Sequence, residues 1–175
     1  MEILIMKAQK GDKEAFIQAI TSYMPVMFKV ARTRLSSEED IGDAIQESIL
    51  SSFKNLQSLK NPSYFRTWII RILINQCNDI AKQNSKIVCI GSYEEVDMLT
   101  KAVYDDNLAG DMDSNHMLMQ LSIDYRTVVA LYYVNGFNTR EISKILNERE
   151  GTIKSRLSRA RAQLKANYAG LLEVR

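Results

Sequence analysis

Residues 139–165 read TREISKILNEREGTIKSRLSRARAQLK, and this stretch decides the fold of the C-terminal part of the chain. Apolar residues recur at helical spacing on both sides of a turn around Asn147–Gly151, which predicts two helices. Asn138 or Thr139 is placed to cap the first of them. Two short helices joined by about four residues, the second rich in bases, have the spacing of a DNA-binding helix-turn-helix.

The second helix separates its residues onto distinct faces when it is drawn with 3.6 residues per turn. One face is apolar and is expected to pack on the first helix at Ile142, Ile145 and Leu146; its members are Ile153, Leu157, Ala160 and Leu164. The opposite face carries small and basic residues, namely Lys154, Ser155, Ser158, Arg159 and Ala162. Arg156 and Arg161 flank the apolar face on its two sides.

The charge of this helix favours DNA binding over the alternative, an ordinary solvated helix. Solvated helices commonly pair acids with bases four residues apart, but no acid occurs between Gly151 and Lys165. Unpaired like charges repel, and contacts with DNA phosphates would offset that cost. The small residues would let the backbone approach the major groove, where Lys154 and Arg159 could reach base edges.

The whole chain has the composition of a helical globular protein. Its 175 residues suffice for one domain or two small ones, with 46% hydrophobic and 25% charged residues and only two prolines. The net charge of +2 is small, but its distribution is uneven: 84–113 holds seven acids and two bases, whereas 137–165 holds eight bases and three acids. We therefore predict an all-α fold with two small helical domains, 1–83 and 114–175, joined by an acidic linker at 84–113.

Three helices are expected in the first domain. The first spans 12–35, with Pro25 expected to bend or interrupt it, and buries Phe16, Ile20, Tyr23, Met27 and Val30. The second starts at a Ser36 or Ser37 cap and turns inward Ile41, Ala44, Ile45, Ser48, Ile49, Ser52, Phe53 and Leu56. The third follows the loop QSLKNPSY and buries Phe65, Trp68, Ile69, Ile72, Leu73, Cys77 and Ile80.

Three motifs in this order resemble a known family. DAIQESIL, FRTWIIRILINQ and TREISKILNEREGTIKSRLSRAR are similar to the sigma-70 family of bacterial RNA polymerase sigma factors, and most of all to its small extracytoplasmic-function (ECF) type, which keeps only regions 2 and 4. The resemblance covers nearly the whole chain. It implies that the first domain is a region 2 helical bundle and that the second is a region 4 helix-turn-helix.

The resemblance also implies site residues. Asp43, Gln46 and Glu47 match the acidic-polar face that docks on the coiled coil of the polymerase β′ subunit. The loop 58–64 and the helix start 65–71 match the part that captures an unpaired −10 base and assists melting. Flipping a base requires a pocket and nearby positive charge, which this segment is expected to supply from Lys60, Asn61, Tyr64, Arg66, Arg71 and Asn75.

In the second domain, the residues that match −35 base-reading positions are Lys154, Ser155, Ser158 and Arg159. The expected phosphate contacts are Arg149, Arg156, Arg161 and Lys165. The chain departs from the family pattern at two serines. Ser122 stands where a proline is frequent, and Ser158 stands where bulkier residues occur, which leaves the −35 sequence open.

The expected partners are core RNA polymerase, through its β′ coiled coil and β flap, and promoter DNA. Family resemblance adds an anti-sigma factor, often membrane-anchored, and regulation of a stress or envelope-response regulon. The competing interpretations are a stand-alone helix-turn-helix regulator binding operator DNA, which has no need for the DAIQES and FRTWIIRI segments, and a protein-interaction adaptor, which does not explain the acid-free helix.

Neither catalysis nor a cofactor is expected. His116 is the only histidine, the seven glycines form no phosphate loop, and no metal-ligand spacing occurs. Cys77 and Cys89 are interpreted as buried free thiols of a reducing compartment. The chain shows neither a signal-peptide core nor a membrane span of about 18 apolar residues, so direct membrane insertion is not expected and the predicted location is the cytoplasm.

Overall fold

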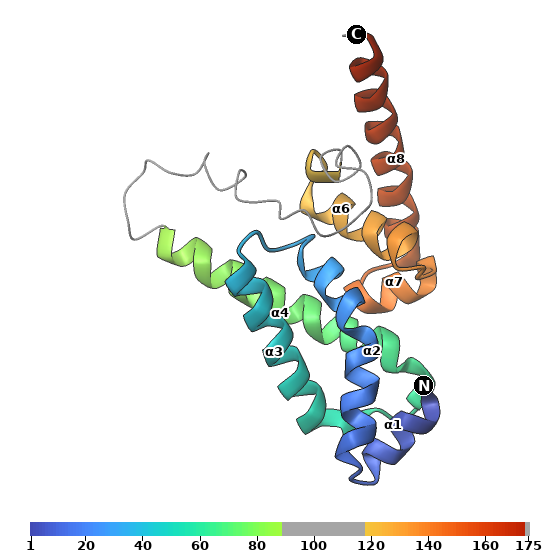
Figure 1. Ribbon diagram of the computed structural model, residues 1–175. Coiled ribbons are helices and arrows are strands. Elements are labelled where there is room, and N and C mark those ends of the chain that lie inside the picture. Colours follow the sequence, from blue (N-terminus) through green and yellow to red (C-terminus); the bar gives the residue numbers. More distant parts are fainter. Residues whose placement is uncertain (89–117, 174–175) are drawn as a thin grey trace.

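The computed structural model describes residues 1–88 and 118–173, and within these ranges the regular structure is helical, which confirms the all-α prediction (Figure 1). The first group of elements comprises α1 (Glu2–Gln9), α2 (Lys13–Ala31), α3 (Glu38–Asn55) and α4 (Phe65–Val88). The short 3₁₀ turns η1 (Leu56–Ser58) and η2 (Pro62–Tyr64) connect α3 to α4. The second group comprises α6 (Ile123–Val129), the π-helical η3 (Ala130–Val134), α7 (Thr139–Leu146) and α8 (Glu150–Glu173).

The helix starts follow from local side-chain caps. Asp12 accepts a hydrogen bond from the Ala15 amide at 2.9 Å, and Ser37, one of the two expected caps, begins α3. Ser122 caps α6, which explains why the family's frequent proline is not needed there: the hydroxyl satisfies a first-turn amide instead. Asn138 and Glu141 form a reciprocal capping box at α7.

Pro25 does not interrupt α2, which continues as one helix from Lys13 to Ala31. The proline removes one backbone hydrogen bond, but the turns after it bury Met27, Val30 and Ala31 completely. Burying that apolar surface offsets the lost bond.

The predicted inward faces are largely those that the structure buries. Phe16, Ile20, Met27 and Val30 of α2 are buried. Phe53 of α3 was expected to be buried but is 49% exposed. It lies near the end of α3, where its ring meets only the edge of Phe16 at a centroid distance of 5.1 Å. Five further residues of the inward faces predicted for the first domain are only half-buried, namely Tyr23, Ile49, Trp68, Ile72 and Ile80.

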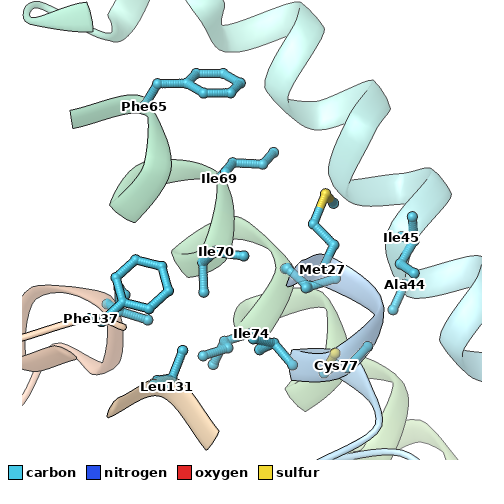
Figure 2. Close-up of a cluster of buried hydrophobic side chains, with 14 of the residues drawn as sticks. Met27, Ala44, Ile45, Phe65, Ile69, Ile70, Ile74, Cys77, Leu131 and Phe137 are labelled. Atoms are coloured by element: carbon cyan, nitrogen blue, oxygen red, sulfur yellow. The ribbon is translucent and has the colours of Figure 1, made fainter. Parts of the chain in front are cut away.

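α4 is buried on a broader arc than expected, because Ile70 and Ile74 are buried as well as Ile69 and Leu73. Figure 2 shows the reason: Ile70 and Ile74 point toward Phe137 and Leu131 of the second helix group, while Ile69 faces α2 and α3. The helix thus packs against both groups at once. The sequence signal for this second face is the pair of three-residue apolar runs in WIIRILI (68–74), which are wider than one helix face requires.

Cys77 lies in the core, as expected, and burial raises the pKa of its thiol to about 11. The thiol is therefore protonated at neutral pH and shielded from reagents. Residues 84–88 of the expected linker belong to α4, whereas the rest of that linker, Cys89 and His116 lie outside the described residues. No helix in the described part of the chain is long and apolar enough to cross a membrane.

Candidate nucleic-acid interface

α8 presents the predicted base-reading face to solvent. Ile153, Leu157 and Ala160 are buried against the neighbouring helices, as their spacing predicts. Ser155, Ser158 and Arg159 are exposed on the other side. Asn147, with a φ of 55°, supplies the left-handed residue that turns the chain from α7 into α8. In Figure 1, the first turns of α8 lie beside α6 and α7, and its C-terminal part projects away from the rest of the molecule.

Lys154 is exposed but not unpaired. Its Nζ lies 2.9 Å from Glu150, one turn earlier, and Thr139 donates to the same carboxylate at 2.8 Å. These two contacts lower the pKa of Glu150. Although residues 151–165 contain no acid, Glu150 at the start of the helix pairs with Lys154. Lys154 must therefore break this ion pair before it can contact a base.

Arg156, unlike the exposed bases of α8, is largely buried in two ion pairs. Its guanidinium pairs with Glu148 at 2.9 Å and with Asp124 at 3.3 Å, and its side chain is only 21% exposed. Arg156 thus ties α8 to the preceding turn and to α6. The remaining expected phosphate residues, Arg149, Arg161 and Lys165, are exposed.

The expected −10 residues lie on η2, on the loop before it and on the first turns of α4. Lys60 and Asn61 are exposed, and the Asn61 side chain accepts hydrogen bonds from the amide and the hydroxyl of Ser63, which shapes η2. Tyr64 is 52% exposed, and the Lys144 ammonium lies 4.9 Å from its ring centroid. α7 thus covers part of this surface.

Arg66, an expected −10 residue, is bound to the second helix group instead of facing solvent. Its guanidinium lies 3.9 Å from the ring centroid of Phe137, and its Nη2 donates to the Asn135 carbonyl oxygen. Arg66 therefore joins the two helix groups in the free chain. Arg71 and Asn75 lie further along α4 and remain exposed.

A cavity of about 300 Å³ lies beside the expected −10 segment. Its walls come from both helix groups and from the N-terminus: Met1, Glu2, Tyr23, 62–67, Glu141 and Lys144. Burial raises the pKa of the Tyr23 hydroxyl, against the opposing charge of Arg66. The lining is mixed in charge, with Arg66 and Lys144 against Glu2 and Glu141, and it includes the aromatic residues Tyr23, Tyr64 and Phe65. Aromatic side chains are the groups on which an unpaired base stacks.

The expected polymerase-binding residues share one exposed face of α3. Asp43, Gln46 and Glu47 point away from the buried face formed by Ile41, Ala44, Ile45 and Ser48. Leu50, one turn later, is 50% exposed. The face therefore combines acidic, amide and apolar groups, a composition suited to protein contact.

The two helix groups are also joined by a polar contact at Arg34 that the sequence did not predict. Arg34 donates through Nη1 to the Thr127 hydroxyl at 3.1 Å and through Nη2 to the Asn78 side-chain oxygen at 2.6 Å. Burial lowers the pKa of Arg34. No signal in the sequence marks this contact, because Arg34 stands among other polar residues such as Arg32 and Thr33.

Comparison with protein families gave two matches in chain order. Residues 19–87 match the model of sigma-70 region 2, and residues 115–164 match that of sigma-70 region 4. Among curated proteins, the RNA polymerase sigma factor SigV of Bacillus subtilis is 26% identical, covering 89% of this chain and 92% of the relative. The ECF sigma factor SigW of the same species is 28% identical over 98% of this chain and 100% of the relative.

Two solved structures share the arrangement. A sigma factor RpoE from Bartonella quintana, crystallised with the anti-sigma factor NepR, superposes with a TM-score of 0.73 at 25% identity, covering 86% of this chain and 94% of that one. CnrH, solved with the cytosolic domain of CnrY, gives a TM-score of 0.69 at 22% identity and 97% coverage of both chains.

Proposed function

Because the chain belongs to the sigma-70 family, as an ECF sigma factor, we propose that it binds core RNA polymerase and directs transcription initiation from specific −35/−10 promoters. The observation that carries this proposal is the match to regions 2 and 4, in this order, along a chain of the relatives' length whose described residues form a helical fold. A stand-alone regulator would account for α7 and α8 but not for the region 2 match or the exposed acidic face of α3.

The −35 element is read by α8. Ser155, Ser158 and Arg159 face the major groove, and Lys154 joins them after leaving Glu150. Arg149, Arg161 and Lys165 neutralise phosphates along the flanks, which supplies affinity without sequence preference. Arg156 serves mainly to hold α8 in place, since phosphate contact would require it to give up two carboxylates.

The −10 element is read at η2 and the start of α4. An unpaired base enters the cavity beside Tyr64, where Arg66 and Lys60 supply positive charge and Asn61 shapes the loop. Arg71 and Asn75 continue the contact along α4. Region 4 lies over part of this surface in the free chain, so α7 and Phe137 leave Arg66 when the strand enters.

The α3 face of Asp43, Gln46 and Glu47 docks on the β′ coiled coil of polymerase, and region 4 engages the β flap. Binding, not catalysis, is the role of this chain, which acts in the cytoplasm with no cofactor of its own. An anti-sigma factor is a further partner, supported by the similarity to the RpoE chain that was solved in complex with one. A stress or envelope-response regulon is the corresponding proposal for its targets.

Run-off transcription with purified core polymerase tests this function. Core enzyme plus this chain is expected to yield promoter-dependent transcripts from a genomic fragment library, and core enzyme alone is not. The variant Glu47→Lys should lose transcription and polymerase binding together, because it reverses a charge on the docking face, while Glu14→Lys on exposed α2 serves as the control. Operator binding by the chain alone, without any transcript from the holoenzyme, would favour the stand-alone regulator.

A further inference from the structure

Gln9, at the end of α1, contacts the loop that carries the proposed −10 residues. Its side-chain Nε2 donates to the carbonyl oxygen of Leu56 at 3.0 Å and to that of Leu59 at 2.8 Å. Because both partners are carbonyl oxygens, only the amide nitrogen of Gln9 can face them. One side chain thus holds both ends of η1 from a helix nearly fifty residues earlier in the chain.

Gln57 forms a second hydrogen bond between η1 and the end of α1, in the opposite direction. Its side-chain Nε2 donates to the main-chain carbonyl oxygen of Gln9. That carbonyl belongs to the last turn of α1, where helix carbonyls lack a partner within the helix. The two glutamines therefore cross-link the end of α1 to η1 in both directions.

Beyond η1 the loop meets the rest of the molecule at η2, where α1 packs against it and the Lys144 ammonium lies 4.9 Å from the Tyr64 ring centroid. Leu56 and Leu59 are buried, but Lys60, Asn61, Ser63 and Tyr64 are exposed, and the polar contacts of Asn61 are made within the loop itself. The loop is therefore anchored at its start by the Gln9 contacts and at its end by Phe65, which is fully buried.

We propose that Gln9 is a positioning residue for −10 recognition: through the Leu56 and Leu59 carbonyls it sets where Lys60–Tyr64 stand relative to the base cavity. It touches no DNA itself. Misplacement of a binding loop by even a fraction of an ångström weakens selectivity strongly, because base recognition depends on short, directional contacts. This inference rests on the proposed function and adds α1 to the −10 machinery.

Two variants remove the contact in different ways. Gln9→Leu keeps similar bulk and deletes the donor, whereas Gln9→Glu places a carboxylate against two carbonyl oxygens. Gln57→Leu, on an exposed side chain, removes only the return bond and is expected to fold normally. Gln18→Leu is the matched control, since Gln18 is an exposed glutamine of α2 for which the described residues offer no side-chain partner.

The readout is base discrimination by holoenzyme. A promoter is first selected by the wild-type holoenzyme from a randomised library, and its −10 region is then held open as a mismatched bubble. Transcription from the selected sequence is compared with that from templates carrying substitutions at each unpaired −10 position, and separately at −35 positions. Thermal unfolding and core-polymerase affinity are measured for every variant.

Gln9→Leu is expected to lower −10 discrimination about fivefold to tenfold, as the loss of one to two hydrogen bonds implies. Gln9→Glu should lower it at least as far and Gln57→Leu less, while Gln18→Leu and all −35 ratios stay at the wild-type value. Unchanged −10 discrimination in Gln9→Leu, or an equal loss at −10 and −35, would overturn the inference. If Gln9→Leu does not fold, Gln9→Glu, which has the same shape as glutamine and also lacks the donor, decides in the same way. The absence of any promoter-dependent transcript from wild-type holoenzyme would instead overturn the proposed function.

Discussion

Arg159 and Arg161 stand two residues apart on α8, yet their surroundings give them different roles. Arg159 is exposed beside Ser155 and Ser158, and no partner for it occurs in the described residues. The Arg161 side chain lies back along the helix, where its Nε donates to the Leu157 carbonyl oxygen at 3.3 Å. The first is therefore placed for base edges and the second for the backbone of DNA.

Arg159→Ala is expected to cost about 1–3 kcal/mol of promoter binding and to relax selectivity at one −35 position. Arg161→Ala should weaken binding to all sequences similarly and reduce the slope of log affinity against log salt by about one. Holoenzyme titrations of promoter variants at several salt concentrations distinguish the two. Identical behaviour of the two variants would contradict the assignment of faces.

Single residues were predictable where their role is local. The caps Ser37 and Asn138, and the buried positions Ile153 and Leu157, follow from spacing and side-chain chemistry within one helix. The pairing of Arg66 with Asn135 and Phe137 joins positions about seventy residues apart. Nothing in the local sequence marks such a contact, because it depends on how two helix groups meet.

At the scale of the element, the turn between α7 and α8 depends on one left-handed residue. Asn147 has a φ of 55°, a conformation in which most side chains meet the following carbonyl oxygen. Its amide still makes the helical bond to the Ser143 carbonyl oxygen, and the Glu148 amide donates to the same oxygen at 3.0 Å, which closes the end of α7. The angle at which α8 leaves the turn is therefore set at Asn147.

Asn147→Ala is expected to lower the free energy of unfolding by about 1 kcal/mol, because alanine tolerates this conformation less well than asparagine. Asn147→Gly at the same position should leave stability equal or slightly higher, since glycine has no such penalty. Urea unfolding followed by circular dichroism measures both. Equal destabilisation by the two substitutions would show that a side-chain contact of Asn147, not its backbone angle, matters.

The sequence predicted which helices exist more accurately than how much of each helix is buried or where each helix ends. The helical period of α4 indicated its inward face, but the burial of Ile70 and Ile74 required the second helix group. Pro25 predicted a bend or an interruption of α2. The helix is not interrupted, because the residues after Pro25 are buried. α8 continues to Glu173, beyond the basic stretch that first identified it.

At the scale of the whole molecule, the two helix groups meet through a mixed contact. The apolar part is Phe137 and Leu131 against α4, and the polar part is Arg34 bonded to Thr127 and Asn78. A cavity of about 180 Å³ lies beside it, lined by Arg71, Asp124 and Arg156 among others. The contact thus joins one continuous apolar cluster to a few polar bonds, and the proposed function requires both to break when region 4 leaves α4.

Thr127→Val is expected to weaken this contact, because it keeps the shape of the side chain but removes the acceptor for Arg34. The free energy of unfolding should fall by about 1.5–3 kcal/mol, the magnitude of a hydrogen bond to a charged group. Small-angle scattering should also report a larger radius of gyration. Thr152→Val, on the exposed start of α8, is the matched control and should change neither quantity; a wild-type scattering profile for Thr127→Val would show that the apolar part suffices.

The double engagement of Arg66 has a consequence for genetics. Its substitution would remove a proposed contact with the −10 strand and, in the same step, weaken the attachment of region 4 to α4. The first effect lowers promoter activity and the second makes the −10 surface easier to reach, so the two oppose each other. A screen for inactive alleles will therefore recover Arg66 less often than Lys60 or Arg71, and its importance will emerge only in a background where the two halves are already apart.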